Sequence, residues 1–171
     1  MTDRTLHVQI LAFHGVEALD FAGPFEVFTT ASRVHARQHA RAAPLFDVRP
    51  VAAAPQVQAR PGLKLLADHP LGDAPVADVL VVPGGVVDAP LADASILAWI
   101  KAQAQGAAIT ASVCTGAFLL AASGVLQGNA CATTHWEDIA DLRERFPALN
   151  VVEGVRWIDN GSIVTSAGIS A

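Results

Sequence analysis

The residue type best suited to covalent chemistry in this sequence is cysteine, and Cys114 lies in the pentapeptide S-V-C-T-G. Residues 107–113 form a short apolar run typical of a buried strand, and the AFLLAA run after Gly116 favours a helix that Gly124 would end. Small residues on either side of the thiol, Ser112 and Gly116, permit the sharp turn of a nucleophile elbow. The pattern therefore predicts a thiol between a strand and a helix.

The expected position of Cys114 at a helix N-terminus has a consequence for its ionisation. Free N–H groups and the positive end of the helix dipole favour thiolate over thiol, so a lowered pKa is expected. The alternative is that Cys114 is a small buried hydrophobic residue, as free cysteines often are. The second cysteine, Cys131, is interpreted as incidental, and two thiols are not expected to form a disulfide framework.

Asp20 lies in the run LDFAGP, whose other residues are apolar or small. A carboxylate among such neighbours is costly to bury unless something pairs with it. Asp20 is therefore expected either to cap the segment that follows Gly23 and Pro24 or to face the cleft at the thiol. Glu17 and Glu26, on the same segment, are expected in solvent.

Two glycines and a histidine are further candidates for a site around the thiol. Gly84 and Gly85 follow the apolar run VLVVP, and their backbone N–H groups could approach a ligand and supply an oxyanion contact; a tight turn is the simpler alternative. His135 follows ATT and could activate the thiol as a Cys–His pair, or serve a structural role. Trp136 could form an apolar wall of the site or belong to the core.

The elements that must position these residues alternate between strand and helix patterns, which predicts an α/β fold with buried parallel strands. Ligands in such folds bind outside the carboxyl ends of the strands. We expect strands at 6–13, 45–51, 79–82, 107–113 and 132–134, a final hairpin with an Asn-Gly turn within 151–165, and helices at 16–34, 92–105, 117–122 and 137–146, with one more helix beginning at Ser166. Gly23 and Pro24 should break or kink the first helix. Residues 52–66 are interpreted as a hairpin excursion and 68–78 as a loop.

Length and composition limit the class of protein. The 171 residues are interpreted as one domain, 52% of them hydrophobic and 16% charged. A net charge of −5 argues against a nucleic-acid surface, and the arginines and histidines within 33–41 are more simply a solvated helix end. No signal peptide and no apolar stretch approaching the ~20 residues of a membrane span are seen, so the cytoplasm is the expected compartment.

Metal and nucleotide sites find no support in the sequence. His35 and His39 have an i, i+4 spacing but lack the glutamate of H-E-x-x-H and a third ligand. Neither G-x-G-x-x-G nor G-x-x-x-x-G-K-[ST] follows an expected strand. A site without cofactor or metal is therefore expected.

Three motifs together resemble the ThiJ/PfpI superfamily: LDFAGPFEVF near the N-terminus, VLVVPGG, and SVCTGAFLLAASGVLQG followed by ATTHW. The likeness spans nearly the whole chain and implies the class I glutamine amidotransferase-like fold, a flavodoxin-like, doubly wound, mostly parallel sheet with helices on both faces. It also implies a homodimer. Relatives continue into one more sheet-covering helix where this sequence stops at Ala171.

The branch that this sequence resembles most holds isonitrile hydratase and the sensor domains of AraC-type regulators. The resemblance implies hydration of an isonitrile to an N-substituted formamide, with Cys114 as nucleophile, Asp20 as general acid and base, and Thr115 assisting by hydrogen bonding. It further implies that Gly85 donates its backbone N–H to the ligand, with Gly84 beside it, and that His135 lines the site. Near residues 128–131 the sequence is one residue longer than the family pattern.

Two alternatives to the hydratase remain open. The sequence is also similar to regulator sensor domains, which bind small molecules without catalysis, although no helix-turn-helix segment is present here. A redox or glyoxalase-like thiol protein is the third possibility, since an exposed thiol of low pKa oxidises readily. A peptidase is disfavoured, because peptidase members carry a histidine directly after the cysteine, where this sequence has Thr115.

Overall fold

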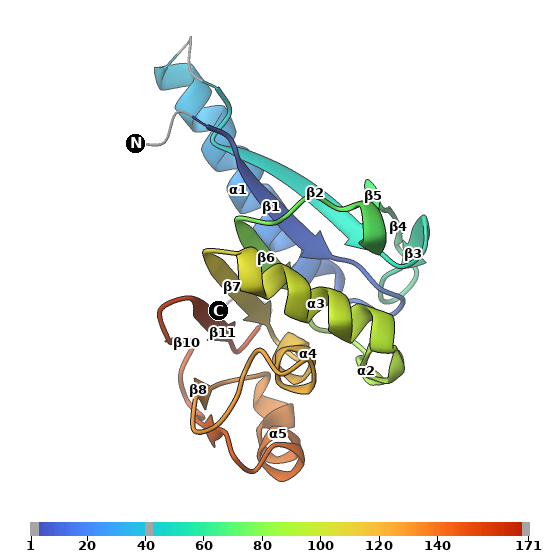
Figure 1. Cartoon of the computed structure of the whole chain (residues 1–171), viewed down its shortest axis with the longest axis vertical. Helices are drawn as coiled ribbons and strands as arrows, with labels where there is room; N and C mark the ends of the chain where they lie inside the picture. Colours follow the sequence, from blue (N-terminus) through green and yellow to red (C-terminus); the bar gives the residue numbers. More distant parts are fainter. Residues whose placement is uncertain (1–3, 40–42, 169–171) are drawn as a thin grey trace.

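A seven-stranded sheet forms the centre of the protein, as a computed structural model of residues 4–39 and 43–168 shows (Figure 1). The strand order is β10-β11-β7-β6-β1-β2-β5, and every neighbouring pair is parallel except β10 with β11. The strands of this sheet are β1 (Leu6–Leu11), β2 (Phe46–Ala52), β5 (His69–Pro70), β6 (Val79–Val82), β7 (Ile109–Val113), β10 (Trp157–Asp159) and β11 (Ile163–Ser166). The predicted doubly wound, mostly parallel α/β fold is confirmed.

Helices cover both faces of the sheet. Helix α1 (Ala18–Gln38) connects β1 to β2 and packs behind them, whereas α3 (Ala94–Gly106) connects β6 to β7 and lies in front (Figure 1). Helix α4 (Gly116–Ala122) contacts β6, β7 and α3. The remaining elements are α2 (Asp88–Ala92), α5 (Ile139–Arg145), the 3₁₀ turns η1 (Leu71–Asp73) and η2 (Trp136–Asp138), and the strand pairs β3 (Gln56–Gln58) with β4 (Lys64–Leu66) and β8 (Cys131–Ala132) with β9 (Asn150–Val151).

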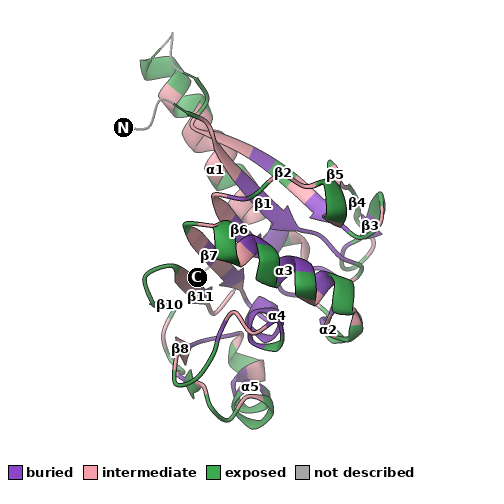
Figure 2. Ribbon diagram, in the orientation of Figure 1, coloured by how far each residue is buried: buried purple, intermediate pink, exposed green. Residues whose placement is uncertain are grey.

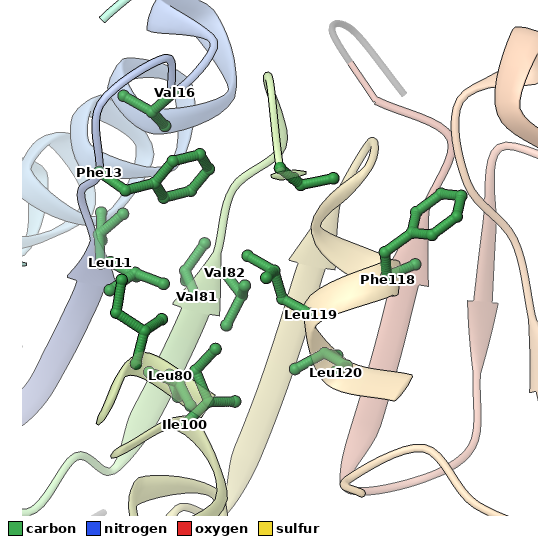
Figure 3. Packing of buried hydrophobic residues seen from close by; sticks show 14 of the residues in the cluster. Leu11, Phe13, Val16, Leu80, Val81, Val82, Ile100, Phe118, Leu119 and Leu120 are labelled. Carbon is green, nitrogen blue, oxygen red and sulfur yellow. The ribbon is translucent and has the colours of Figure 1, made fainter. Parts of the chain in front are cut away.

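The hydrophobic core lies between the central strands and the helices in front of and behind them. Figure 3 shows Leu80 and Val82 of β6 facing Ile100 of α3 and Leu119 of α4, and all four are 5% exposed or less. Buried residues concentrate on the central strands and on α4, while the outer faces of α3 and α5 are exposed (Figure 2). The central strands are apolar on both faces because both faces are covered.

The structure corrects two predictions about the elements and refines a third. The first helix was expected to break or kink at Pro24, but no break occurs: α1 continues to Gln38, and Gly23 before the proline has no Cβ to meet the ring. The helix expected at 92–105 is present as α3, which begins at Ala94 because Asp93 caps it by accepting bonds from the N–H groups of Ser95 and Ile96. The expected loop at 68–78 contains β5 and η1.

The C-terminal hairpin with its Asn-Gly turn is confirmed, and Gly161 there has φ 87°. Ser166 ends β11 rather than beginning a helix, and residues 167–168 are not helical either; the rest of the expected final helix lies outside the described residues. Within residues 4–39 and 43–168, no helix has the length and apolar character needed to cross a membrane.

Candidate active site

Cys114 occupies a strained turn between β7 and α4. Its φ of 55° is the one positive value among the non-glycine residues that the structure describes. This left-handed conformation costs a residue with a Cβ on the order of 1–3 kcal/mol and persists only where the surroundings hold it. The Cys114 N–H donates to the Ser166 carbonyl at 3.0 Å, and the Cys114 carbonyl accepts from the Thr134 hydroxyl at 2.9 Å. The predicted nucleophile elbow is therefore present.

Three glycines let other backbone segments approach this elbow closely. A Cβ on Gly84 would lie 2.6 Å from the Thr115 nitrogen, and one on Gly168 would lie 2.4 Å from the Cys114 Cβ. A Cβ on Gly116 would lie 2.1 Å from the Val82 carbonyl oxygen. These segments meet because β6, β7 and β11 are parallel neighbours whose carboxyl ends share one edge of the sheet.

Thr115 and Gly85 are joined by two hydrogen bonds. The Gly85 N–H donates to the Thr115 hydroxyl oxygen at 2.9 Å, and that hydroxyl donates to the Gly85 carbonyl at 2.9 Å. The predicted backbone donor therefore already has a partner, and a ligand oxygen would have to share or displace this bond. Gly84 does not line the pocket; instead its carbonyl accepts from the Glu17 N–H at 2.8 Å.

A pocket of about 410 Å³ opens at the elbow. It is lined by Glu17, Arg60, Gly85, Cys114, Thr115, His135, Glu137 and Asp138. Asp20 is not part of this wall: it is 1% exposed and its carboxylate forms a hydrogen bond with the Cys114 thiol. The sequence candidates thus come together in two layers, with Cys114, Thr115, Gly85 and His135 facing the pocket and Asp20 buried behind the thiol.

The predicted lowering of the Cys114 pKa is wrong. Burial raises the pKa of this thiol to about 12, and the negative charge of Asp20 adds to that effect. The Thr115 backbone N–H opposes both by donating to the sulfur, but this one hydrogen bond does not offset them. Cys114 is 7% exposed, and such burial favours the thiol over the thiolate.

Acidic side chains surround His135, which is the expected histidine of the site. Its Nδ1 lies 3.4 Å from an Asp138 carboxylate oxygen and 3.7 Å from one of Glu137. Trp136 is 75% exposed and belongs neither to the core nor to the pocket wall. The described residues contain no group of three His, Cys, Asp or Glu side chains that could bind a metal ion.

Comparison with known proteins identifies the family of this chain. Residues 6–171 match the DJ-1/PfpI family. The chain belongs to the DJ-1/PfpI family. It is 35% identical over 167 residues to an isonitrile hydratase of Pseudomonas putida, and this alignment covers 97% of the present chain and 67% of that protein. A crystal structure of a ThiJ/PfpI family protein from Pseudomonas syringae superposes with a TM-score of 0.80 at 26% identity, covering 98% of this chain and 64% of that one.

Regulators are also among the similar proteins. The HTH-type transcriptional regulator GbdR of Pseudomonas aeruginosa is 33% identical over 113 residues, which is 66% of this chain and 30% of the regulator. This DJ-1/PfpI chain therefore spans about two thirds of the length of the isonitrile hydratase and of the P. syringae protein, and under one third of GbdR.

Sequence reasoning missed several residues of this DJ-1/PfpI site. Glu17, expected in solvent, lines the pocket with its side chain 31% exposed, whereas Glu26 is exposed as expected. Arg60 reaches the pocket from the loop between β3 and β4, 4.0 Å from Glu17. Of the missed residues, only Glu137 and Asp138, directly after T-T-H-W, could have been predicted from the sequence, because acids next to a candidate site histidine can pair with it.

Thr134 donates a hydrogen bond to the elbow from another segment of the chain. Its side chain is 1% exposed, and its hydroxyl donates to the Cys114 carbonyl across 20 positions of sequence. Thr134→Val keeps the shape of the side chain and removes the hydrogen-bond donor. It is expected to slow the alkylation of Cys114 by about threefold to tenfold, or to shift the pH dependence of the alkylation rate. It should also lower the free energy of unfolding by about 1–3 kcal/mol. The alkylation rate against pH measures the first effect, and urea unfolding measures the second.

Thr165 provides the matched control for this prediction. It is equally buried, and its hydroxyl accepts from the Thr133 N–H at 2.9 Å without bonding to Cys114. Thr165→Val should cost similar stability yet leave the alkylation profile in place, and Thr134→Ser should restore the wild-type profile. Equal profiles for the two valine variants would mean that Thr134 only stabilises the fold.

Proposed function

We propose that this protein hydrates small isonitriles to N-substituted formamides, with Cys114 as the nucleophile. The observation that carries the proposal is the elbow itself: a cysteine at φ 55° that faces a pocket of about 410 Å³ and has a buried carboxylate hydrogen bonded to its thiol. The similarity to an isonitrile hydratase over 97% of the chain supports it. An acid beside a thiol suits a substrate whose terminal carbon must receive a proton.

The reaction begins with the Cys114–Asp20 pair and the isonitrile R–N≡C. The sulfur forms a bond to the terminal carbon while a proton passes from the pair to that same carbon, giving the thioimidate Cys114–S–CH=N–R. Because the thiol pKa of about 12 keeps the sulfur protonated at neutral pH, this proton is already present when the substrate arrives. Addition is therefore expected to couple sulfur attack to proton transfer through Asp20.

Hydrolysis completes the cycle. Asp20, now acting as general base, removes a proton from a water molecule whose oxygen bonds to the thioimidate carbon, and passes that proton to the imine nitrogen. The carbon–sulfur bond then breaks, the remaining hydroxyl proton goes to the sulfur, and the formamide R–NH–CHO leaves. Thr115 and Gly85, joined by their two hydrogen bonds, would hold the pocket wall next to the reacting carbon, and His135 lines the same pocket.

The proposal is tested by incubating the purified chain with cyclohexyl isocyanide and following N-cyclohexylformamide by chromatography. Wild type should produce formamide, and Cys114→Ala should produce none above the uncatalysed rate while melting within a few degrees of wild type. A folded wild-type chain that forms no formamide would contradict the hydratase proposal.

A small-molecule sensor is the second candidate, and the similarity to GbdR supports it. The same pocket would then bind a ligand without consuming it. A thermal shift on ligand addition, with no turnover in the isonitrile assay and with the shift retained in Cys114→Ala, would favour the sensor. A redox role has less support, because the thiol that it requires has a low pKa and is exposed, whereas Cys114 is buried and its pKa is raised.

We also propose that two copies associate through the outer face of α1. Leu19, Val27 and Val34 lie along this face and are 49%, 65% and 44% exposed, lining an open apolar groove. Glu26 and Arg33 lie on either side of the helix midpoint, so an antiparallel pair of α1 helices would place opposite charges together twice. Sedimentation velocity of wild type and Val27→Glu tests this: a dimer that the substitution dissociates is expected, and a wild-type monomer would contradict it.

A further inference from the structure

We propose that the pocket at Cys114 admits neutral and cationic ligands and discriminates against anionic ones, because carboxylates dominate its wall. This inference rests on the proposed function only in taking the pocket as the ligand site; it does not require the chain to be a hydratase. It adds a substrate class to that proposal: isonitriles whose R group is uncharged or carries an ammonium, rather than a carboxylate or sulfonate.

Acidic side chains outnumber basic ones in the wall of this pocket. Glu17, Glu137 and Asp138 contribute three carboxylates, and Arg60 contributes one guanidinium. Arg60 lies 4.0 Å from Glu17, so its charge is largely balanced within the wall. Glu137 and Asp138 remain, facing the partly buried ring of His135 at 3.7 and 3.4 Å.

One of these two acids, Asp138, acts on the sulfur. Burial raises the pKa of Cys114 most, and the charges of Asp20 and Asp138 raise it further. A carboxylate that disfavours a negative sulfur will likewise disfavour a negative ligand group placed near that sulfur. Clefts lined by one sign of charge concentrate ligands of the opposite sign, with effects of about 10-fold to 1000-fold on association rates that fall with ionic strength.

Two thiosulfonate reagents of similar size test the inference without any turnover. The 2-aminoethyl and 2-sulfonatoethyl methanethiosulfonates differ in the sign of their charge and react alike: a thiolate attacks the sulfenyl sulfur, a mixed disulfide forms and methanesulfinate leaves. Peptide mass spectrometry gives the labelling rate of each cysteine, so Cys131 in the same molecule reports the effect of overall net charge. The measured quantity is the cation-to-anion rate ratio at Cys114 divided by that at Cys131.

This quotient, the preference of Cys114 for the cationic reagent relative to that of Cys131, is expected to be about 10 in low salt. It should fall several-fold in about 0.5 M sodium chloride. Asp138→Asn and Glu137→Gln should each lower it by about twofold to fivefold. Glu144→Gln is the matched control: it removes one negative charge from an exposed position of α5 outside the pocket wall and should leave the quotient unchanged.

A quotient near one, or equal reductions in Asp138→Asn and Glu144→Gln, would overturn the inference. Its failure is distinct from failure of the hydratase proposal, because labelling needs no isonitrile. A chain that labels selectively but forms no formamide retains the charge preference and loses the reaction. A chain that forms formamide but labels without preference keeps the reaction and loses the inferred substrate class.

Discussion

Replacing Asp20 with asparagine is expected to speed up the alkylation of Cys114 and to slow the production of formamide. Because the charge of Asp20 is one of the causes that raise the thiol pKa, its removal lowers that pKa, and each unit of lowering gives about tenfold more thiolate below the pKa. Alkylation by iodoacetamide at pH 8 should therefore become about tenfold faster. Formamide production should fall by about 100-fold or more, because the group that moves the proton is lost.

The pH dependence of Cys114 alkylation shows whether Asp20 raises or lowers the pKa of the thiol. In wild type the alkylation rate should keep rising with pH towards 12, and in Asp20→Asn the whole profile should move to lower pH. Glu144→Gln, an exposed substitution on α5 outside the pocket wall, serves as the control and should leave both properties at wild-type values. An unshifted profile in Asp20→Asn, or retained formamide production, would show that Asp20 does not act on the sulfur.

The second large effect is expected at Gly116, the first residue of α4. A Cβ there would lie 2.1 Å from the Val82 carbonyl oxygen and 2.9 Å from that of Pro83, and neither backbone atom can move without shifting β6. Gly116→Ala should therefore lower the free energy of unfolding by at least about 3 kcal/mol, measured by urea unfolding. Because Cys114 and Thr115 precede this glycine directly, labelling of the thiol should change as well.

Gly72 is the matched control for this substitution. It lies in the exposed 3₁₀ turn η1, and a Cβ there would meet no atom within 4 Å. Gly72→Ala should leave the free energy of unfolding within about 0.5 kcal/mol of wild type. A stable Gly116→Ala variant would mean that α4 can move away from β6, and the rigid elbow described above would be wrong.

Much of the fold could be predicted from the sequence because its signals are local. Apolar runs such as VLVV at 79–82 identify buried parallel strands, and the glycines beside the thiol identify the elbow. The first helix does not break at Pro24, because the glycine before the proline has no Cβ to meet its ring. The start of α3 at Ala94 depends on a capping bond of Asp93, which a helical pattern alone does not distinguish from an exposed acid.

The ionisation of the thiol could not be predicted in the same way. A helix N-terminus is visible in the sequence near Cys114, but the burial of the sulfur and the arrival of Asp20 depend on tertiary contacts across 94 positions. Glu17 and Arg60 were missed as pocket residues for the same reason, because they lie far from Cys114 in sequence. Patterns locate a nucleophile, whereas its pKa depends on residues that only the folded chain brings to it.

The most direct test of the account is to stop the wild-type reaction with acid during turnover of cyclohexyl isocyanide and measure the mass of the protein and of its peptides. We predict a gain equal to the whole mass of the isonitrile, located on the peptide that contains Cys114 and absent from Cys114→Ser. Formamide that continues to form in Cys114→Ser, or an adduct found on Cys131 alone, would contradict the assignment of Cys114 as the nucleophile.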